Sequence, residues 1–309
     1  MMNLKKPKFW DYKKPNIYAY LLLPVTILIN LFNFFKIKKS KTKFKIKTIC
    51  IGNIYLGGTG KTSLSIKLNK IFKDKNIKSC FIKKKYKAQI DEQKILEKNG
   101  KLFISNNRID AIKQAENANY EVAIFDDGLQ DHKIKYDVRI VCFNTINWIG
   151  NGMTIPSGPL RENIKNLKKY EHIFLNGNLE ELEAHKKYLI NINPNINVHT
   201  GVYEISNLKE FNLNDKYLIF SGIGNHKTFV ETVRGYGFKV QKDLEFPDHY
   251  NYKNRDLDNI FVEAEKLGCK ILTTEKDYFR LENKNLNEIK FIKSDLKIID
   301  EEKLFKSII

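Results

Sequence analysis

Residues 52–62, Gly-Asn-Ile-Tyr-Leu-Gly-Gly-Thr-Gly-Lys-Thr, constrain the fold of this chain more than any other stretch. In a loop of this composition the backbone N–H groups cradle phosphate oxygens, the lysine reaches the terminal phosphates, and the threonine hydroxyl ligates Mg²⁺. The apolar run 46–51 before the loop is typical of a strand, and apolar residues recur at helical spacing over 61–74. The sequence therefore predicts a strand, a phosphate-binding loop and a helix whose N-terminus receives the phosphates.

Tyr55 occupies the position at which the strict motif G-x-x-x-x-G-K-[ST] has its first glycine. The chain instead matches the variant x-G-G-x-G-K-T, in which Gly57, Gly58 and Gly60 are present. A glycine turn that joins a strand to a helix without binding a nucleotide is the alternative interpretation.

Strand-like and helix-like segments alternate along the rest of the chain. The strand-like runs are 46–51, 77–82, 101–105, 121–126, 138–143 and 171–175, and the helical patterns are 61–74, 92–99 and 108–118. This alternation predicts an α/β fold of the P-loop NTPase type, in which helices flank a parallel sheet and ligands bind at the carboxyl ends of the strands. An asparagine-rich loop at 191–197 precedes a second alternating unit, with strands at 216–221, 238–241 and 269–273, a helix at 226–236 and a lysine-rich tail.

The N-terminus carries a different signal, an uncharged stretch of 19 residues over 17–35 with lysines on both sides. That length is about the minimum for crossing a bilayer, and Pro24, Asn30 and Asn33 weaken a true span. We expect an interfacial helix on the cytoplasmic side that the lysines hold at anionic headgroups. A buried core helix is the alternative. The expected domains are therefore a membrane-associated helix with its basic flank over 1–40, a P-loop nucleotide-binding domain over 41–208, and a smaller C-terminal α/β domain over 209–309.

Net charge indicates which classes of partner the chain can bind, and the cysteines indicate whether it has disulfides or a zinc site. The chain has 54 basic and 36 acidic residues, a net charge of +18, which favours an anionic partner such as nucleic acid, a membrane or a phosphorylated substrate. The lysine content is also what an AT-rich genome produces. Because the lysines cluster beside the apolar segment and are not interleaved with aromatics, we expect no nucleic-acid partner. Four scattered cysteines without a C-x-x-C pair predict reduced core residues and no zinc site.

Two pairs of acidic residues are candidates for metal binding or acid–base catalysis. Asp126 and Asp127 follow an apolar strand, where a carboxylate can hold Mg²⁺ or its water shell opposite the glycine loop. Asp91 and Glu92 precede a helical pattern, and spacing alone favours their being acids that stabilise a helix N-terminus. His249, beside Asp248, is a candidate acid–base group, although a lone loop histidine is more often structural.

Six motifs in a fixed order bring in a family resemblance. They are Gly52–Thr62, Asp126–Gln130, Gly150–Glu162, Ser221–Asn225, Phe246–His249 and Thr273–Asp277. Together they closely resemble the tetraacyldisaccharide 4′-kinases, the membrane-associated lipid A kinases of Gram-negative bacteria. The similarity runs from the apolar N-terminus to about residue 281.

The resemblance implies a reaction and a location. The family transfers the γ-phosphoryl group of ATP to the 4′-hydroxyl of an acylated glucosamine disaccharide 1-phosphate, which gives lipid IVA. By the same resemblance the cofactors are ATP and Mg²⁺, and the enzyme lies on the cytoplasmic face of the bacterial inner membrane, attached through its N-terminus. The oligomeric state is left open.

The resemblance also implies roles for individual residues. Asp91 would be the catalytic base, His249 would support it, and Lys61 would act on the phosphates. Arg161 would contact an anionic group of the substrate. ATP would be bound by Gly57, Gly58, Thr59, Gly60, Lys61 and Thr62, and the metal by Thr62, Glu92, Asp126 and Asp127.

Two departures from the family pattern stand out. Where the family has Arg-Gly-Tyr-Gly after the second strand, this chain has Lys83-Lys84-Lys85-Tyr86-Lys87, and Asp91 follows after a shortened loop. The family's Gln-His is Gln130-Asp131-His132 here. No role is assigned to Thr274, Lys276 or Asp277.

A membrane-bound ATPase switch of the partitioning or targeting type is the alternative function. Proteins of that class share the Gly-Gly-x-Gly-Lys-Thr loop. They generally carry a lysine before the paired glycines, where this chain has Leu56, and they lack the segment 156–162.

Overall fold

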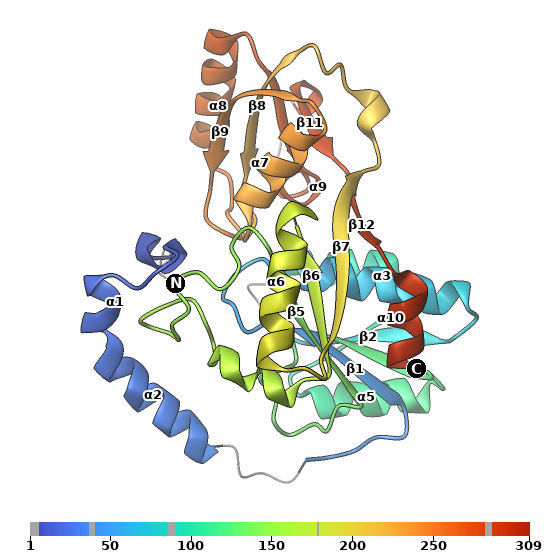
Figure 1. The fold of residues 1–309 in the computed structure, drawn as a ribbon. Helices are drawn as coiled ribbons and strands as arrows, with labels where there is room; N and C mark the ends of the chain where they lie inside the picture. The colour runs from blue at the N-terminus through green and yellow to red at the C-terminus, as the bar shows by residue number, and fades with distance from the viewer. Residues whose placement is uncertain (1–5, 37–40, 86–89, 178, 282–285) are drawn as a thin grey trace. The chain divides into compact units, whose positions relative to one another are not determined.

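The computed structural model describes residues 6–36, 41–85, 90–177, 179–281 and 286–309. The chain divides into two compact units, one formed by residues 6–202 with 298–309 and the other by residues 203–297. Both units are drawn in Figure 1.

The first unit is built on an eight-stranded sheet with the order β12-β7-β6-β5-β1-β4-β2-β3, to which residues 203–297 contribute the end of β7 and most of β12. The pairs β1–β4, β1–β5, β2–β3, β2–β4, β5–β6 and β6–β7 are parallel. The strands are β1 (Lys47–Gly52), β2 (Ser79–Lys84), β3 (Leu102–Ser105), β4 (Val122–Asp126), β5 (Val138–Asn144), β6 (His172–Asn176), β7 (Asn197–Ile205) and β12 (Ser294–Ile298). The predicted α/β class with a mainly parallel sheet is confirmed.

The order of the central strands positions the site. The chain leaves β1, crosses through helix α3 (Lys61–Asp74) and enters β2, but β4 lies between β1 and β2. Ile51 of β1 pairs with Asp126 of β4, and Ile82 of β2 pairs with Phe125. The carboxyl ends of β1, β4 and β2 therefore lie side by side at one edge of the sheet.

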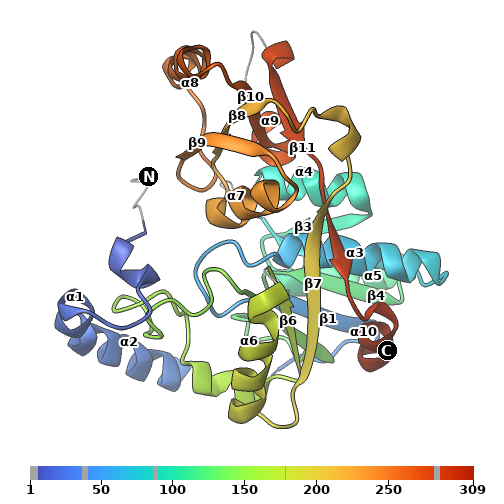
Figure 2. The same ribbon diagram turned by 45° about the horizontal axis from the view of Figure 1, so that its top comes forward.

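Helices cover both faces of this sheet (Figures 1 and 2). Helices α5 (Arg108–Asn117) and α6 (Leu179–Ile192) contribute to one core, in which they pack against Cys50, Phe125 and Val141. On α3, Phe72 contacts Phe305 of α10 (Glu301–Ile308), with ring centroids 5.9 Å apart. Successive strand residues point to opposite faces, so Ile49 and Ile51 face away from the Cys50 core. Helix α4 (Ile90–Asn99) contacts α3 and β3.

The second unit contains a four-stranded sheet with the order β11-β10-β8-β9, in which all pairs are parallel. Its strands are β8 (Lys216–Ser221), β9 (Lys239–Glu245), β10 (Lys270–Thr274) and β11 (Ile289–Ile292). Tyr217 and Ile219 pack in the same core as helix α7 (His226–Gly235), whereas Leu218 and Phe220 pack with α8 (Asn254–Leu267). Strand alternation thus places one helix on each face.

The tail predicted to be only lysine-rich instead forms regular structure. Strands β11 and β12 and helix α10 all lie in it. Leu304 and Ile308 of α10 are buried, one turn apart on one face of the helix. The apolar residues of this segment are few and are interspersed with lysines, so the sequence pattern alone did not predict these elements. Further short helices are η3 (Ile164–Lys169), η4 (Leu208–Glu210), α9 (Glu275–Tyr278) and η5 (Leu286–Glu288).

The apolar N-terminal stretch forms two short helices after η1 (Lys8–Asp11), namely α1 (Ile17–Leu21) and α2 (Leu23–Lys36). Pro24 lies in the first turn of α2, where its missing N–H is tolerated. Among the described residues, no helix has both the length and the apolar character needed to span a membrane. Large apolar side chains are exposed along both helices, namely Ile17, Tyr18, Tyr20, Leu21, Val25, Ile27, Leu28, Ile29, Leu31 and Phe32.

Candidate active site

The glycine loop joins β1 to α3 in the conformation that phosphate binding requires. Gly57 and Gly60 have positive φ angles of 141° and 81°, which residues with a Cβ atom rarely adopt. Asn53 Nδ2 donates to the carbonyl of Gly57 at 3.1 Å, and Asn176 Nδ2 at the end of β6 donates to the carbonyl of Thr59 at 2.8 Å. Lys61 begins α3, so the free N–H groups of its first turn form an anion site.

Tyr55, in the same loop, is buried. It forms an antiparallel bridge with Leu160, and its hydroxyl contacts Asp11 and Lys6. Backbone bonds from Leu56 N to Pro159 O (2.9 Å) and from Arg161 N to Ile54 O hold the same side of the loop. At the position where the chain departs from the strict motif, Tyr55 therefore has a packing role.

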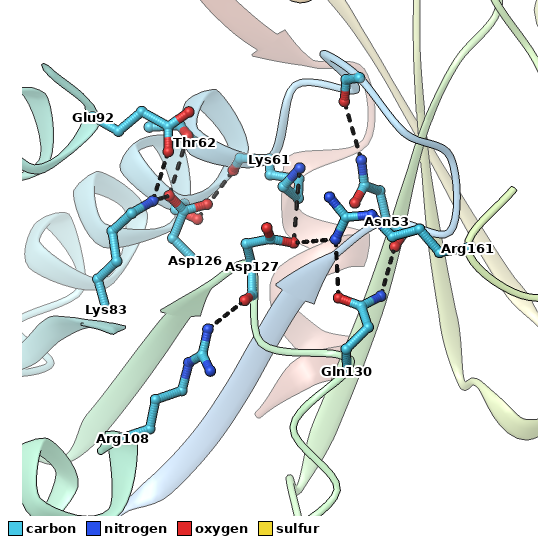
Figure 3. Close-up of polar contacts among 12 residues, drawn as sticks. Asn53, Lys61, Thr62, Lys83, Glu92, Arg108, Asp126, Asp127, Gln130 and Arg161 are labelled. Atoms are coloured by element: carbon cyan, nitrogen blue, oxygen red, sulfur yellow. Dashed lines mark hydrogen bonds and ion pairs between the residues drawn. The ribbon is translucent and has the colours of Figure 1, made fainter. Parts of the chain in front are cut away.

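Asp126 ends β4 next to the loop and is almost fully buried. Its Oδ2 accepts hydrogen bonds from Thr62 Oγ1 at 3.2 Å and from Lys83 Nζ at 2.6 Å (Figure 3). Its Oδ1 is buried and has no hydrogen-bond partner among the described residues. A buried carboxylate oxygen that lacks a donor, beside a threonine hydroxyl, is the oxygen donor set that Mg²⁺ prefers. These residues fit the metal that the resemblance implies.

Asp127 points to a different group of side chains. Its Oδ1 lies 3.9 Å from Lys61 Nζ and 3.3 Å from Arg161 Nη1, and its carbonyl accepts from Arg108 Nη2 at 2.6 Å. Arg161 Nη1 also donates to Gln130 Oε1 at 3.1 Å (Figure 3). Asp127 adopts a left-handed φ of 62°, which is uncommon for a residue other than glycine. That conformation turns its carboxylate toward the two cations.

Glu92 lies in the first turn of α4. It forms an ion pair with Lys83, a residue to which the sequence assigned no role. Lys83 Nζ, at the end of β2, lies 2.8 Å from Glu92 Oε2. Burial alone lowers the pKa of Lys83, but Asp126 and Glu92 together raise it above its ordinary value, so the ammonium stays charged. The signal that would have identified Lys83 is its place on the strand beside β4, which requires the strand order. Asp91 belongs to α4, and its side chain lies outside the described residues.

His249 belongs to the second unit, where it has a left-handed φ of 59°. Its Nδ1 lies 3.4 Å from Arg280 Nη2, and its Nε2 lies 3.8 Å from Asp248 Oδ1. Arg280 in turn donates to the carbonyl of Gly222 at 2.8 Å and to Asp277 Oδ1 at 3.1 Å. The motifs around Gly222, His249 and Asp277 therefore meet within this unit.

Asp277, to which the sequence assigned no role, is the centre of that cluster and is fully buried. Its carboxylate accepts from Gly222 N at 3.0 Å, Tyr252 Oη at 3.0 Å and Thr274 Oγ1 at 2.6 Å. Burial and the neighbouring Asp277 carboxylate raise the pKa of Tyr252, so its hydroxyl stays protonated as a donor. Asp277 thus links the segments of the second unit that carry Gly222, Tyr252 and Thr274.

All four cysteines lie in the described part of the chain. Cys50, Cys80 and Cys142 are buried free thiols, and Cys269 is a free thiol of intermediate exposure. Within the described part of the chain, no group of three His, Cys, Asp or Glu side chains is placed to hold a metal ion by itself.

Comparisons with known proteins agree on one family. The family model described as "Tetraacyldisaccharide-1-P 4'-kinase" (LpxK) matches residues 18–309. The tetraacyldisaccharide 4′-kinase of Pelagibacter ubique is 58% identical over 308 residues, covering 100% of this chain and 98% of the relative. That of Rickettsia canadensis is 32% identical over 331 residues, covering 99% and 98%.

A solved structure has the same fold. The crystal structure of an "apo" form of LpxK from Aquifex aeolicus in complex with ATP superposes with a TM-score of 0.66 at 24% sequence identity, covering 94% of this chain and 98% of that one. The sequence matches favour the kinase over the ATPase switch. A family model that matches nearly the whole chain, and a relative with more than half its residues identical, show that the chain belongs to the tetraacyldisaccharide-1-phosphate 4′-kinase family.

Proposed function

We propose that this kinase carries out phosphoryl transfer at the carboxyl ends of β1, β4 and β2, onto the 4′-hydroxyl of an acylated glucosamine disaccharide 1-phosphate. The observation that carries the proposal is the hydrogen bond of 3.2 Å between Thr62 at the start of α3 and Asp126 at the end of β4. It joins a phosphate-binding loop to a buried carboxylate. Phosphoryl transfer needs mainly positioning and neutralisation of charge, and this arrangement supplies both.

The glycine loop and its metal would hold ATP. Gly57, Gly58, Thr59 and Gly60 would offer backbone N–H groups, and Lys61 would place its ammonium on the terminal phosphates. Thr62, Glu92, Asp126 and Asp127 would hold Mg²⁺ directly or through its water shell. When bound, Mg²⁺ would neutralise charge that develops on the transferred group.

The substrate hydroxyl would be activated from α4. A sugar hydroxyl is a weak acid, so a carboxylate within hydrogen-bond reach is a suitable base. We assign that role to Asp91 and the support of the base to His249. Arg161, whose guanidinium is held by Asp127 and Gln130, would contact an anionic group of the substrate with its remaining donors.

Asp91→Asn is expected to lower kcat by about 10²-fold or more, because the carboxylate that accepts the proton is lost. The assay incubates protein, Mg-ATP and the tetraacyl disaccharide 1-phosphate in detergent micelles, and mass spectrometry detects one added phosphoryl group. Asp110→Asn is the matched control, because Asp110 is an exposed acid in the first turn of α5. Equal activity of both variants would remove Asp91 as the base. Absence of product from wild type, with ATP hydrolysis intact, would favour the ATPase switch.

We further propose that α1 and α2 attach the enzyme to the cytoplasmic face of the inner membrane. Leu21 and Leu28 are 68% and 66% exposed, and burying each leucine in lipid is worth about 1.5–3 kcal/mol. The lysines beside the stretch would be attracted to anionic headgroups.

The double variant Leu21→Asp/Leu28→Asp is expected to weaken binding to anionic phospholipid vesicles by about 10²-fold or more, because two apolar contacts with lipid are lost. Flotation of the protein with the vesicles measures this. Val262→Asp is the control, since Val262 on α8 is 64% exposed. Attachment through another surface would leave the double variant bound as tightly as wild type.

A further inference from the structure

Lys83 is a buried lysine whose ammonium lies between two carboxylates. Its side chain is 1% exposed, and its Nζ lies 2.6 Å from Asp126 Oδ2 and 2.8 Å from Glu92 Oε2. Figure 3 shows the ammonium pointing into the space between the two acids, beside Thr62. A lysine is almost never fully buried without such partners, and removal of one member of a buried ion pair leaves an uncompensated charge.

The position of Lys83 follows from the sheet. It comes one residue after Ile82, which pairs with Phe125, so its side chain meets that of Asp126 across the β2–β4 pair. Lys84, the next residue, points to the other face of the strand. The lysine run that replaces the family's Arg-Gly-Tyr-Gly thus places one ammonium inside the site and not at the surface.

The ammonium and a divalent metal would use the same oxygens. Asp126 Oδ2 accepts from both Thr62 and Lys83, and Thr62 and Asp126 belong to the proposed metal site. Two cations that share carboxylates repel each other strongly in a site of low dielectric. A free metal ion, which brings no anion with it, has to overcome that repulsion, whereas a metal that arrives with ATP brings the negative charge of the phosphates.

We infer that Lys83 is a resident cation of the nucleotide-free site, which holds Asp126 and Glu92 together and excludes free divalent metal, so that metal enters with the nucleotide. This rests on the proposed metal site. Lys83 is a positioning residue for the two carboxylates. Because Lys83 lies at the carboxyl end of β2 beside Asp126, metal binding at this site would depend on the binding of ATP.

Mn²⁺ binding in the absence of ATP tests the inference. Electron paramagnetic resonance of free Mn²⁺ would titrate wild type, Lys83→Met and Lys84→Met. We expect Lys83→Met to bind Mn²⁺ about ten-fold or more tightly than wild type, because the competing charge is gone. Lys84→Met removes the same charge one residue away and is expected to match wild type. Equal affinity of wild type and Lys83→Met would overturn the inference.

A second measurement and a second variant keep the inference testable if Lys83→Met folds poorly. Mn²⁺ without ATP is expected to raise the Tm of Lys83→Met and to leave that of wild type unchanged, because a ligand stabilises only the state that binds it. Lys83→Gln keeps a donor for one carboxylate and is expected to show the same gain, so no Mn²⁺-dependent rise in either variant would also overturn the inference.

A further variant separates the two proposals. Lys83→Met/Asp126→Asn is expected to lose the gained Mn²⁺ affinity. If Asp126→Asn did not weaken Mn²⁺ binding even with ATP present, the metal site itself would be wrong. If it did weaken binding, while wild type and Lys83→Met bound Mn²⁺ equally, only the role of Lys83 would fail.

Discussion

Lys61→Met is expected to lower kcat for phosphoryl transfer by about 10³-fold or more, as the loss of a cation that stabilises charge on the transferred phosphoryl group does in related reactions. Lys61 is the first residue of α3, directly after the left-handed Gly60, and we propose that its ammonium binds the terminal phosphates. Its Nζ is 3.9 Å from Asp127 Oδ1, and its side chain is only 15% exposed. Initial rates of product formation in micelles, measured by mass spectrometry, give the change in kcat.

Lys67→Met is the matched control for that variant. Lys67 lies on the same helix, but its Nζ pairs with Glu301 Oε2 at 2.8 Å on the partly exposed side. Such a pair is worth about 0–1 kcal/mol of stability, so activity is expected to equal that of wild type. A Lys61→Met enzyme as active as Lys67→Met would show that the loop does not bind the transferred phosphate.

Asp277→Ala is expected to destabilise the second unit by about 3–5 kcal/mol, the cost of removing one member of a buried ion pair. The carboxylate is fully buried and accepts from the backbone of Gly222 and from Tyr252 and Thr274. Its loss removes the acceptor of these donors, and it removes the carboxylate that pairs with the guanidinium of Arg280. Both tryptophans lie outside residues 203–297, so tryptophan fluorescence would not report on this unit. Hydrogen exchange of the slowest amides in β8 and β10 would measure the free energy of unfolding instead.

Asp258→Ala provides the comparison for the Asp277 variant. Asp258 is an exposed residue of α8 in the same unit, and substitutions at such positions change stability by at most about 0.5 kcal/mol. The expected pattern is faster exchange throughout β8 and β10 in Asp277→Ala alone. Equal protection in the two variants would mean that Asp277 contributes no more to stability than a surface carboxylate.

Local sequence was enough to predict the elements whose geometry depends on neighbours along the chain. The glycine loop and α3 follow from residues within one stretch, because φ angles of +141° and +81° at Gly57 and Gly60 require glycine. Asp126 was predicted at a strand end because an apolar run stops there. The division of the apolar N-terminus into α1 and α2 was not predicted, although Pro24 was noted.

The tertiary structure alone decided which residues meet. Nothing in the local pattern states that β4 lies between β1 and β2, and without that order Lys83 is one lysine among many. In the same way, Tyr55 became a packing residue only through its bridge to Leu160, and Asp277 a central acceptor only because Gly222 and Tyr252 reach it. The sequence by itself determined the phosphate-binding loop, since backbone conformation is a local property. Strand order and register, which arise from contacts between distant segments, determined the charges that surround the loop.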